Sequence, residues 1–262
     1  LMGFLGALVA HSLGRSPYLG LAFVFYPGFY FSLRCDLVEP LAACLLLAYL
    51  LAMQKGKWAA AGVLAALGVL ARETLVMVPF GVFVEGLVAG RRRGDVPAGR
   101  LWWQAPAGVV FVSMQAAMYA NWGTLPFLEA KGNLGPPFAG FLTYLKWHLD
   151  KFEVFTLVNH LEIAGIVLIA VFVLWICLKN GFRGEFQFTW LLYFLLAFCL
   201  TNYVWVDNMA YLRTLTTFVF LGLFLVMKNG RYIAERVAYV YITVTMVLLI
   251  GTLFISDAVF FR

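Results

Sequence analysis

Long apolar stretches, broken by short polar turns, run through almost the whole of this sequence. Of its 262 residues, 63% are hydrophobic and only 12% are charged, about half the charged fraction of soluble domains. One globular core cannot shelter so much apolar surface, so lipid has to be part of the solvent. The pattern predicts an all-α, polytopic transmembrane bundle of about nine or ten membrane helices, some of them short or broken.

Proline residues and the lengths of the runs refine this prediction. Pro17 can open a helix, whereas Pro27 and Gly28 predict a break midway along the run 17–34. The run 37–53 is the cleanest span. The next two runs, 58–70 and 75–89, fall short of the roughly 20 residues of a full crossing and predict a hairpin with Arg72–Glu73 at its tip. Further spans are predicted at about 101–121, 156–178, 187–205, 211–227 and 237–256.

The stretch 122–153 is the one long polar interruption. Its second part repeats apolar residues at helical spacing with charged residues between them, namely Phe138, Phe141, Leu142, Leu145, Leu149 and Phe152. This pattern is typical of a helix that lies on a bilayer surface. We therefore predict one transmembrane domain over 1–262 with an outer-face loop at 122–153. Because the chain opens inside an apolar run, we expect at least one helix and a loop to precede Leu1.

Basic residues predict the orientation of the bundle. Twelve of the 19 lysines and arginines fall in the turns at 14–16, 54–57, 90–100, 179–185 and 228–236. The positive-inside rule assigns these turns to the cytoplasm. The net charge of +6 then reflects loop charge and not nucleic-acid binding. As a consequence, Asp36, Glu39, Arg72, Glu73 and Arg213 all fall on the opposite, outer face.

These outer charges are the candidate functional residues, because a charge near the bilayer centre costs about 3 kcal/mol. A structural alternative exists for each of them. Asp36 and Glu39 have the spacing of a capping box. Arg72 cannot pair with its helical neighbour Glu73, so it either pairs with Asp36 or Glu39 or meets a phosphate, which suits its forked donors. Arg213 could form a helix-end pair with Asp207.

Metal ligands and familiar catalytic motifs are not apparent in the sequence. Four cysteines lie in or beside apolar runs without metal spacing and are interpreted as buried thiols: Cys35, Cys44, Cys177 and Cys199. His148 and His160 lack a second ligand at metal spacing. The sequence contains no Walker loop, Rossmann fingerprint or nucleophile elbow.

One stretch resembles a known family. The segment FYPGFYFSLRCDLVEPLAACLLLAYLL, a basic turn and AALGVLARETLVMVPFGVFV resemble the membrane core of the GT-C glycosyltransferase superfamily over residues 17–87. These polytopic enzymes use polyprenyl-phosphate-linked sugars at the outer face of a membrane. The resemblance implies an assisting carboxylate at Asp36 and phosphate contacts at Arg72 and Arg213. We add their charged neighbours Arg34, Glu39 and Glu73 as candidate substrate-binding residues.

The resemblance also implies a reaction. An acceptor hydroxyl attacks the anomeric carbon, a carboxylate takes its proton, and arginine stabilises the leaving lipid phosphate. The family's usual catalytic carboxylate belongs to a first outer loop, which would lie upstream of Leu1. Whether a divalent metal such as Mg²⁺ or Mn²⁺ assists is left open. The expected location is a bacterial inner membrane, with the bilayer and the lipid-linked donor as partners.

Two other functions stay open. The first is a non-catalytic subunit of this fold, packed against membrane-protein partners in a larger complex, since 17% of the residues are aromatic. The second is a transporter, which the broken helices at Pro27 and Pro79 would suit, although no inverted repeat is visible in the sequence.

Overall fold

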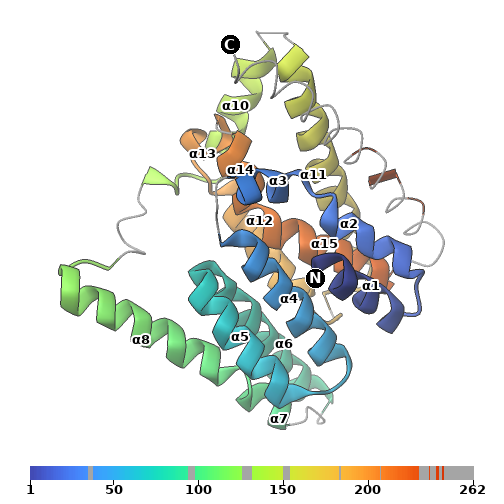
Figure 1. Ribbon diagram of the computed structural model, residues 1–262, viewed down its shortest axis with the longest axis vertical. Coiled ribbons are helices and arrows are strands. Elements are labelled where there is room, and N and C mark those ends of the chain that lie inside the picture. The colour runs from blue at the N-terminus through green and yellow to red at the C-terminus, as the bar shows by residue number, and fades with distance from the viewer. Residues whose placement is uncertain are drawn as a thin grey trace.

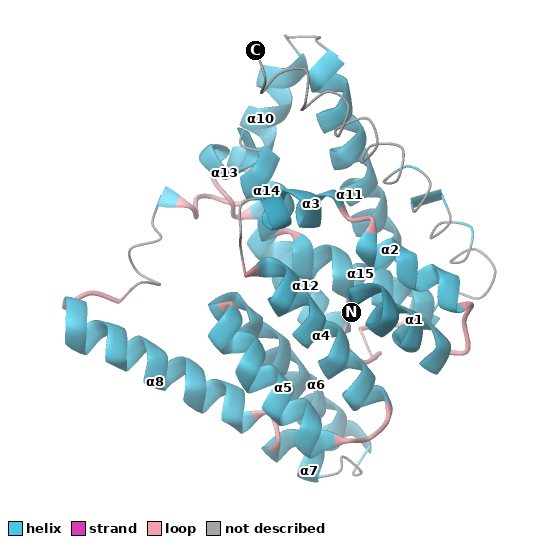
Figure 2. Cartoon of the chain, viewed as in Figure 1, coloured by secondary structure: helices cyan, strands magenta, loops and turns pink. Residues whose placement is uncertain are grey.

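A computed structural model gives the arrangement of the chain (Figure 1). It describes residues 1–34, 38–93, 98–125, 132–149, 154–182, 184–206 and 208–229, together with residues 236, 240, 241 and 244. Within these ranges the regular structure is helical, and one isolated bridge joins Leu134 to Leu200 (Figure 2). The predicted all-α class is therefore confirmed. Most of the predicted span 237–256 lies outside the described residues.

The first helices follow the prolines. Helix α1 (Met2–Ser12) is followed by the 3₁₀ turn η1 (Pro17–Gly20), which begins at Pro17 as predicted. Helices α2 (Leu21–Val24) and α3 (Pro27–Arg34) are separated just before Pro27. A proline has no amide hydrogen and its ring collides with the preceding turn. The run 17–34 therefore forms three short pieces instead of one span.

Three helices in sequence form one half of the molecule (Figure 1). They are α4 (Glu39–Gln54), α5 (Trp58–Ala71) and α6 (Met77–Arg93). Gly56 makes the first turn in the left-handed region, with φ of 67°, where glycine carries no Cβ penalty. At the second turn Arg72 has an extended backbone, and the 3₁₀ turn η2 (Glu73–Val76) leads into α6. This is the predicted hairpin, with Arg72–Glu73 at its tip.

Two helices after the hairpin continue this half. The short α7 (Ala98–Trp102) leads into α8 (Ala105–Trp122), which packs against α5. Figure 1 shows α8 extending away from the other helices at the lower left. Much of its surface is exposed, including Val109, Val112 and Tyr119 at 56–65%.

The second half is built from six helices. They are α10 (Ala139–Leu149), α11 (Val154–Lys179), α12 (Gln187–Phe198), α13 (Asn202–Val206), α14 (Asn208–Thr214) and α15 (Thr216–Asn229). The predicted span 187–205 divides into α12 and α13. The amides of Gly135 and Phe138 donate to the carbonyls of Cys199 and Phe198 at 2.7 and 2.6 Å. The loop that contains Gly135 and Phe138 thereby hydrogen-bonds to the carbonyls of Cys199 and Phe198, which a continuing helix would use for its own hydrogen bonds.

Helix α15 occupies the centre of the second half. Every residue from Thr216 to Met227 is buried, as expected for a helix that is apolar on all sides. Gly222 allows α11 to pack closely, because a Cβ there would lie 2.7 Å from Cγ2 of Ile169. On another side the ring of Phe220 contacts Phe23 and Phe29, with centroids 4.9 and 5.2 Å away. These contacts hold α2 and α3 against the core.

The predicted surface helix exists as α10, but part of its apolar face meets protein. Phe141 packs against Trp205 with ring centroids 5.0 Å apart, and Tyr144 is fully buried. Leu142 is 60% exposed on the other side. The helical periodicity therefore predicted the helix itself. It did not predict that α12 and α13 would cover one side of this helix.

Among the described residues, two helical stretches are long and apolar enough to cross a membrane: Glu73–Gly90 and Leu161–Lys179. Shorter apolar helices accompany them, namely Met2–Ser12, Glu39–Gln54, Trp58–Ala71, Gln187–Phe198 and Thr216–Asn229. The expected number of about nine or ten crossings thus stays a prediction, although the helical character of the runs that the structure describes is confirmed.

Candidate functional site

Charged side chains from three distant parts of the chain meet where α4 begins and where α5 and α14 end. Nε of Arg213, in the last turn of α14, lies 3.0 Å from Oε1 of Glu39, the first residue of α4. Nη1 of Arg72, just after α5, donates to the carbonyl oxygen of Arg213 at 2.9 Å. We call Glu39, Arg72 and Arg213 the arginine cluster.

The burial of the three side chains is unequal. The Glu39 side chain is 7% exposed, and its buried Oε2 has no hydrogen-bond partner among the residues that the structure describes. The Arg213 side chain is 35% exposed and Arg72 is half-buried. A carboxylate this deep requires a counter-charge, which Arg213 supplies. Two guanidinium groups against one carboxylate leave the cluster with a positive excess, and Arg213 is its accessible part.

Each charge also suits the helix end at which it lies. Glu39 opens α4, where the helix dipole favours a negative charge, and Arg213 lies in the last turn of α14, where it favours a positive one. Arg72 lies between two helical segments and has φ of −153° and ψ of 113°. Its extended backbone ends α5 and turns the chain toward η2.

The hairpin tip is held from two other helices. Nε2 of Gln115 in α8 donates to Oε2 of Glu73 at 3.2 Å. The hydroxyl of Tyr193 in α12 donates to the carbonyl of Thr74 at 2.7 Å. Sequence reasoning did not assign Gln115 or Tyr193 to the site. Gln115 could have been singled out from the sequence, because it is a strongly polar side chain inside an apolar run.

Helix α14 is held in place by a second pair of contacts. The hydroxyl of Tyr211 donates to Oε2 of Glu162 in α11 at 3.0 Å, and Glu162 is 6% exposed. The hydroxyl of Tyr26 and Oγ1 of Thr216 both donate to the carbonyl of Leu212. Side chains thus bind a carbonyl at the junction of α14 and α15, the two helices that cover most of the predicted span 211–227.

The structure places only some of the predicted site residues. Glu39, Arg72 and Arg213 come together, and Glu73 lies at the same hairpin tip but faces α8. Asp36 and the side chain of Arg34 lie outside the described part of the chain, so their assignment stays a prediction.

Two structural alternatives are corrected. The predicted capping box is wrong, because α4 begins at Glu39, with Val38 at the N-cap and no side-chain cap. Glu39 is turned toward Arg213 instead of its own helix start. The direct pairing of Arg72 with Glu39 is also replaced, since Arg213 makes the ion pair and Arg72 holds the backbone of Arg213.

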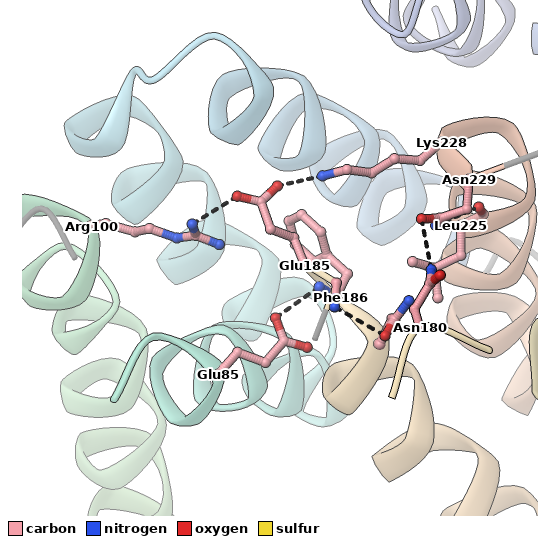
Figure 3. Close-up of polar contacts among 10 residues, drawn as sticks. Glu85, Arg100, Asn180, Glu185, Phe186, Leu225, Lys228 and Asn229 are labelled. Atoms are coloured by element: carbon pink, nitrogen blue, oxygen red, sulfur yellow. Dashed lines mark hydrogen bonds and ion pairs between the residues drawn. The ribbon is translucent and has the colours of Figure 1, made fainter. Parts of the chain in front are cut away.

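A second polar network lies at the other ends of these helices (Figure 3). Glu185 accepts hydrogen bonds from Arg100, at 2.7 Å, and from Lys228. Nδ2 of Asn180 donates to Asn229 at 3.3 Å, and Nε of Arg15 donates to the carbonyl of Met227 at 2.9 Å. Four of the five turns that the sequence grouped by charge are therefore joined directly in space. We call this region the basic end.

The fifth turn, at 54–57, adjoins the same network. The Arg100 guanidinium lies 6.0 Å from the ring centroid of Trp58. At the end of α4, the hydroxyl of Tyr49 donates to Oε1 of Gln104 at 2.8 Å, and Nε2 of Gln104 donates to the carbonyl of Arg100 at 3.0 Å. These contacts bring described parts of the basic turns together, and the assignment of the turns to the cytoplasmic side stays a prediction.

The charges at the basic end predict a pH dependence of stability. Burial alone would raise the pKa of Glu185, but the hydrogen bond and charge of Lys228, together with Arg100, outweigh it and hold the pKa below its ordinary value. The stabilisation is therefore present at neutral pH and is lost as the pH falls through this lowered pKa. We expect Glu185→Gln to lower the unfolding midpoint at pH 7 and to leave it nearly unchanged near pH 3. Thermal unfolding in detergent from pH 7 to pH 3 measures this, and parallel curves for the two proteins would contradict it.

Glu85 of α6 caps the start of α12 (Figure 3). Its carboxylate accepts the amides of Phe186 and Phe188, both at 2.7 Å, and of Thr189 at 3.1 Å. One turn earlier, Gly81 lets α6 come close, because a Cβ there would lie 2.4 Å from Oγ1 of Thr189. The carboxylate thus satisfies amides that have no partner within α12.

The described ranges hold no cluster of metal ligands at the arginine cluster. Within them, no group of three or more His, Cys, Asp or Glu side chains gathers to hold a metal. Glu39 faces an arginine and Glu73 an amide, so the described side chains do not fit a divalent cation. A small cavity lined by Tyr26, Glu162 and Tyr241 has a volume of about 10 Å³, which is room for one water molecule.

Comparison of the chain with protein-family models, with curated proteins and with solved structures finds no match.

Proposed function

We propose that this chain is a polytopic membrane glycosyltransferase of the GT-C type. It would transfer a sugar from a polyprenyl-phosphate donor at the membrane face that carries the arginine cluster. The observation that carries the proposal is the meeting of two arginines beside one buried carboxylate: Arg213 pairs with Glu39, and Arg72 donates to the backbone carbonyl of Arg213. The stretch that contains Glu39 and Arg72 is also the stretch that resembles the family.

Membrane residence is supported by helix α8 in addition to the two long apolar helices. Trp102 and Trp103 precede α8 and Trp122 ends it, and all three are exposed. Its 18 residues span about 27 Å at 1.5 Å per residue, close to the roughly 30 Å of a hydrocarbon core. Tryptophans at both ends of an exposed apolar helix are typical of the two membrane–water interfaces.

The chemistry of the cluster suits the phosphate of a lipid-linked sugar. Guanidinium groups bind phosphate oxygens through paired N–H donors, and such bonds are stronger where water is scarce. Glu39 occupies one edge of Arg213, and Arg213 remains one-third exposed. Arg72 fixes the backbone of Arg213 and adds a second positive charge beside it. During transfer this charge would stabilise the phosphate as the leaving group.

Binding of a polyprenyl phosphate tests the proposal without knowledge of the sugar. We expect Arg72→Gln, in detergent or nanodiscs, to bind a polyprenyl phosphate about 10- to 100-fold more weakly than the wild type, the loss expected for hydrogen bonds to a charged group. Native mass spectrometry of the protein with added lipid gives the affinities. Arg15→Gln is the matched control, because Arg15 also donates to a backbone carbonyl at 2.9 Å but at the basic end.

The comparison of the two variants distinguishes a loss of phosphate binding from a general loss of packing. Equal affinity of the Arg72→Gln and Arg15→Gln proteins for polyprenyl phosphate would contradict the proposal. Weaker binding in Arg72→Gln alone supports it, and transfer from radiolabelled lipid-linked sugars would then establish the reaction and the donor.

The alternative function is that of a non-catalytic membrane subunit, which the exposed helix α8 favours. Its residues Val109 and Val112 are 64% and 65% exposed, so a partner helix could cover them as readily as lipid. Gel filtration in mild detergent tests this function, and a monodisperse single chain would argue against it.

A further inference from the structure

Six cations of the basic end, whose side chains the structure describes, fall into two groups. Arg15, Arg100 and Lys228 have partners inside the molecule, and Glu185 lies between two of them. Lys55 and Lys57, in the turn after α4, and Lys179, at the end of α11, are exposed and form no ion pair with any residue that the structure describes. The first group stabilises the fold. The second group leaves positive charge on the surface.

Exposed tryptophans accompany the second group. Trp102 is 75% exposed, Trp103 42% and Trp175 48%. The Lys179 ammonium lies 5.1 Å from the ring centroid of Trp175. Tryptophan has an apolar body and one N–H donor, which makes it suited to the headgroup level of a bilayer.

Glu85 and Glu185, the carboxylates that the structure describes nearby, both have partners of their own. Glu185 is held between Arg100 and Lys228, and Glu85 is directed at the amides that begin α12. Lysine charges beside tryptophans, next to exposed apolar side chains such as Leu178 at 64%, suit an anionic group at the edge of an apolar phase. A nucleic acid would supply the charge but not the apolar neighbourhood.

We propose that Lys55, Lys57, Lys179, Trp102, Trp103 and Trp175 form a headgroup surface that binds the phosphate headgroups of anionic phospholipids. This site is at the basic end and is distinct from the arginine cluster. It requires that the chain resides in a membrane, but it does not depend on sugar transfer.

The test compares lipid retention by the whole chain in nanodiscs of phosphatidylcholine with and without phosphatidylglycerol. We expect the wild type to retain phosphatidylglycerol in preference to phosphatidylcholine, as measured by native mass spectrometry. The triple variant K55Q/K57Q/K179Q should lose about fivefold in affinity for each lysine removed. The variant K55R/K57R/K179R, which keeps the charges, should retain the preference.

A control at the other end of the molecule makes the result specific. Lys146 is an exposed lysine of α10, which lies far from α7 (Figure 1). Lys146→Gln should leave the retention of phosphatidylglycerol unchanged. The proposal is overturned if K55Q/K57Q/K179Q retains phosphatidylglycerol like the wild type. It is also overturned if Lys146→Gln lowers the affinity for phosphatidylglycerol by as much as each lysine of the triple variant does, or if inorganic phosphate alone displaces the lipid.

Discussion

Replacing Glu85 with leucine is expected to destabilise the protein by about 3–5 kcal/mol. Each hydrogen bond to a charged group contributes about 1.5–3 kcal/mol, and the carboxylate accepts three amides at the start of α12. Leucine would leave these amides without acceptors in a half-buried setting, and such unsatisfied groups cost more than the bonds contribute on average. Unfolding in mixed detergent micelles measures the change in free energy.

Glu85→Gln is the matched variant for this prediction. Its one carbonyl oxygen can still accept the amides of Phe188 and Thr189, so the expected loss is about 1–2 kcal/mol. Hydrogen exchange adds a local readout, because the amides of Phe186, Phe188 and Thr189 should lose protection before those of α15 do. Wild-type stability in Glu85→Leu would show that the carboxylate is not needed to hold α6 and α12 together.

The second large effect is expected at the ion pair of Glu39 and Arg213. Arg213→Leu leaves a carboxylate buried without its partner and should cost about 3–5 kcal/mol. Glu39→Leu should cost less, about 1–2 kcal/mol, because the Arg213 side chain is 35% exposed and can recover water whereas the Glu39 side chain is 7% exposed. Equilibrium unfolding of both single variants and of the double variant gives the three free energies.

The double variant provides the control. If the two side chains stabilise each other, Glu39→Leu/Arg213→Leu should cost less than the two single changes added together, by about 1–3 kcal/mol. Simple additivity would mean that the pair is not coupled and that other neighbours, such as Arg72, carry the charge of Glu39.

Features that depend on nearby residues were predictable from the sequence. Pro17 and Pro27 predicted where helices begin and break, and the shortness of the runs beside Arg72–Glu73 predicted the hairpin. The grouping of the basic turns followed from the positive-inside rule, and contacts such as Arg100 with Glu185 bear out that grouping.

Part of the candidate site was also predictable. Charges in apolar runs are costly, so the sequence alone was enough to propose Arg72 and Arg213 as candidate site residues. Their arrangement was not, since the sequence suggested Asp36, Glu39 or a phosphate as the partner of Arg72, and in the structure it is Arg213 that pairs with Glu39. Tyr211 was missed because a tyrosine in an apolar run has no distinctive pattern, whereas Glu162, a charge inside the run 156–178, was a usable signal that was not followed.

The sequence by itself determined the helical class, most of the turns and the set of charged residues that need an explanation. These follow from local physics: apolar run length, proline geometry and the cost of a charge in lipid. The tertiary structure alone decided which residues meet, including Glu39 with Arg213 and Glu85 with the start of α12. The reason is that helices such as α15, apolar on every side, carry no pattern that tells which face turns to which neighbour, so packing over the whole chain selects the partners.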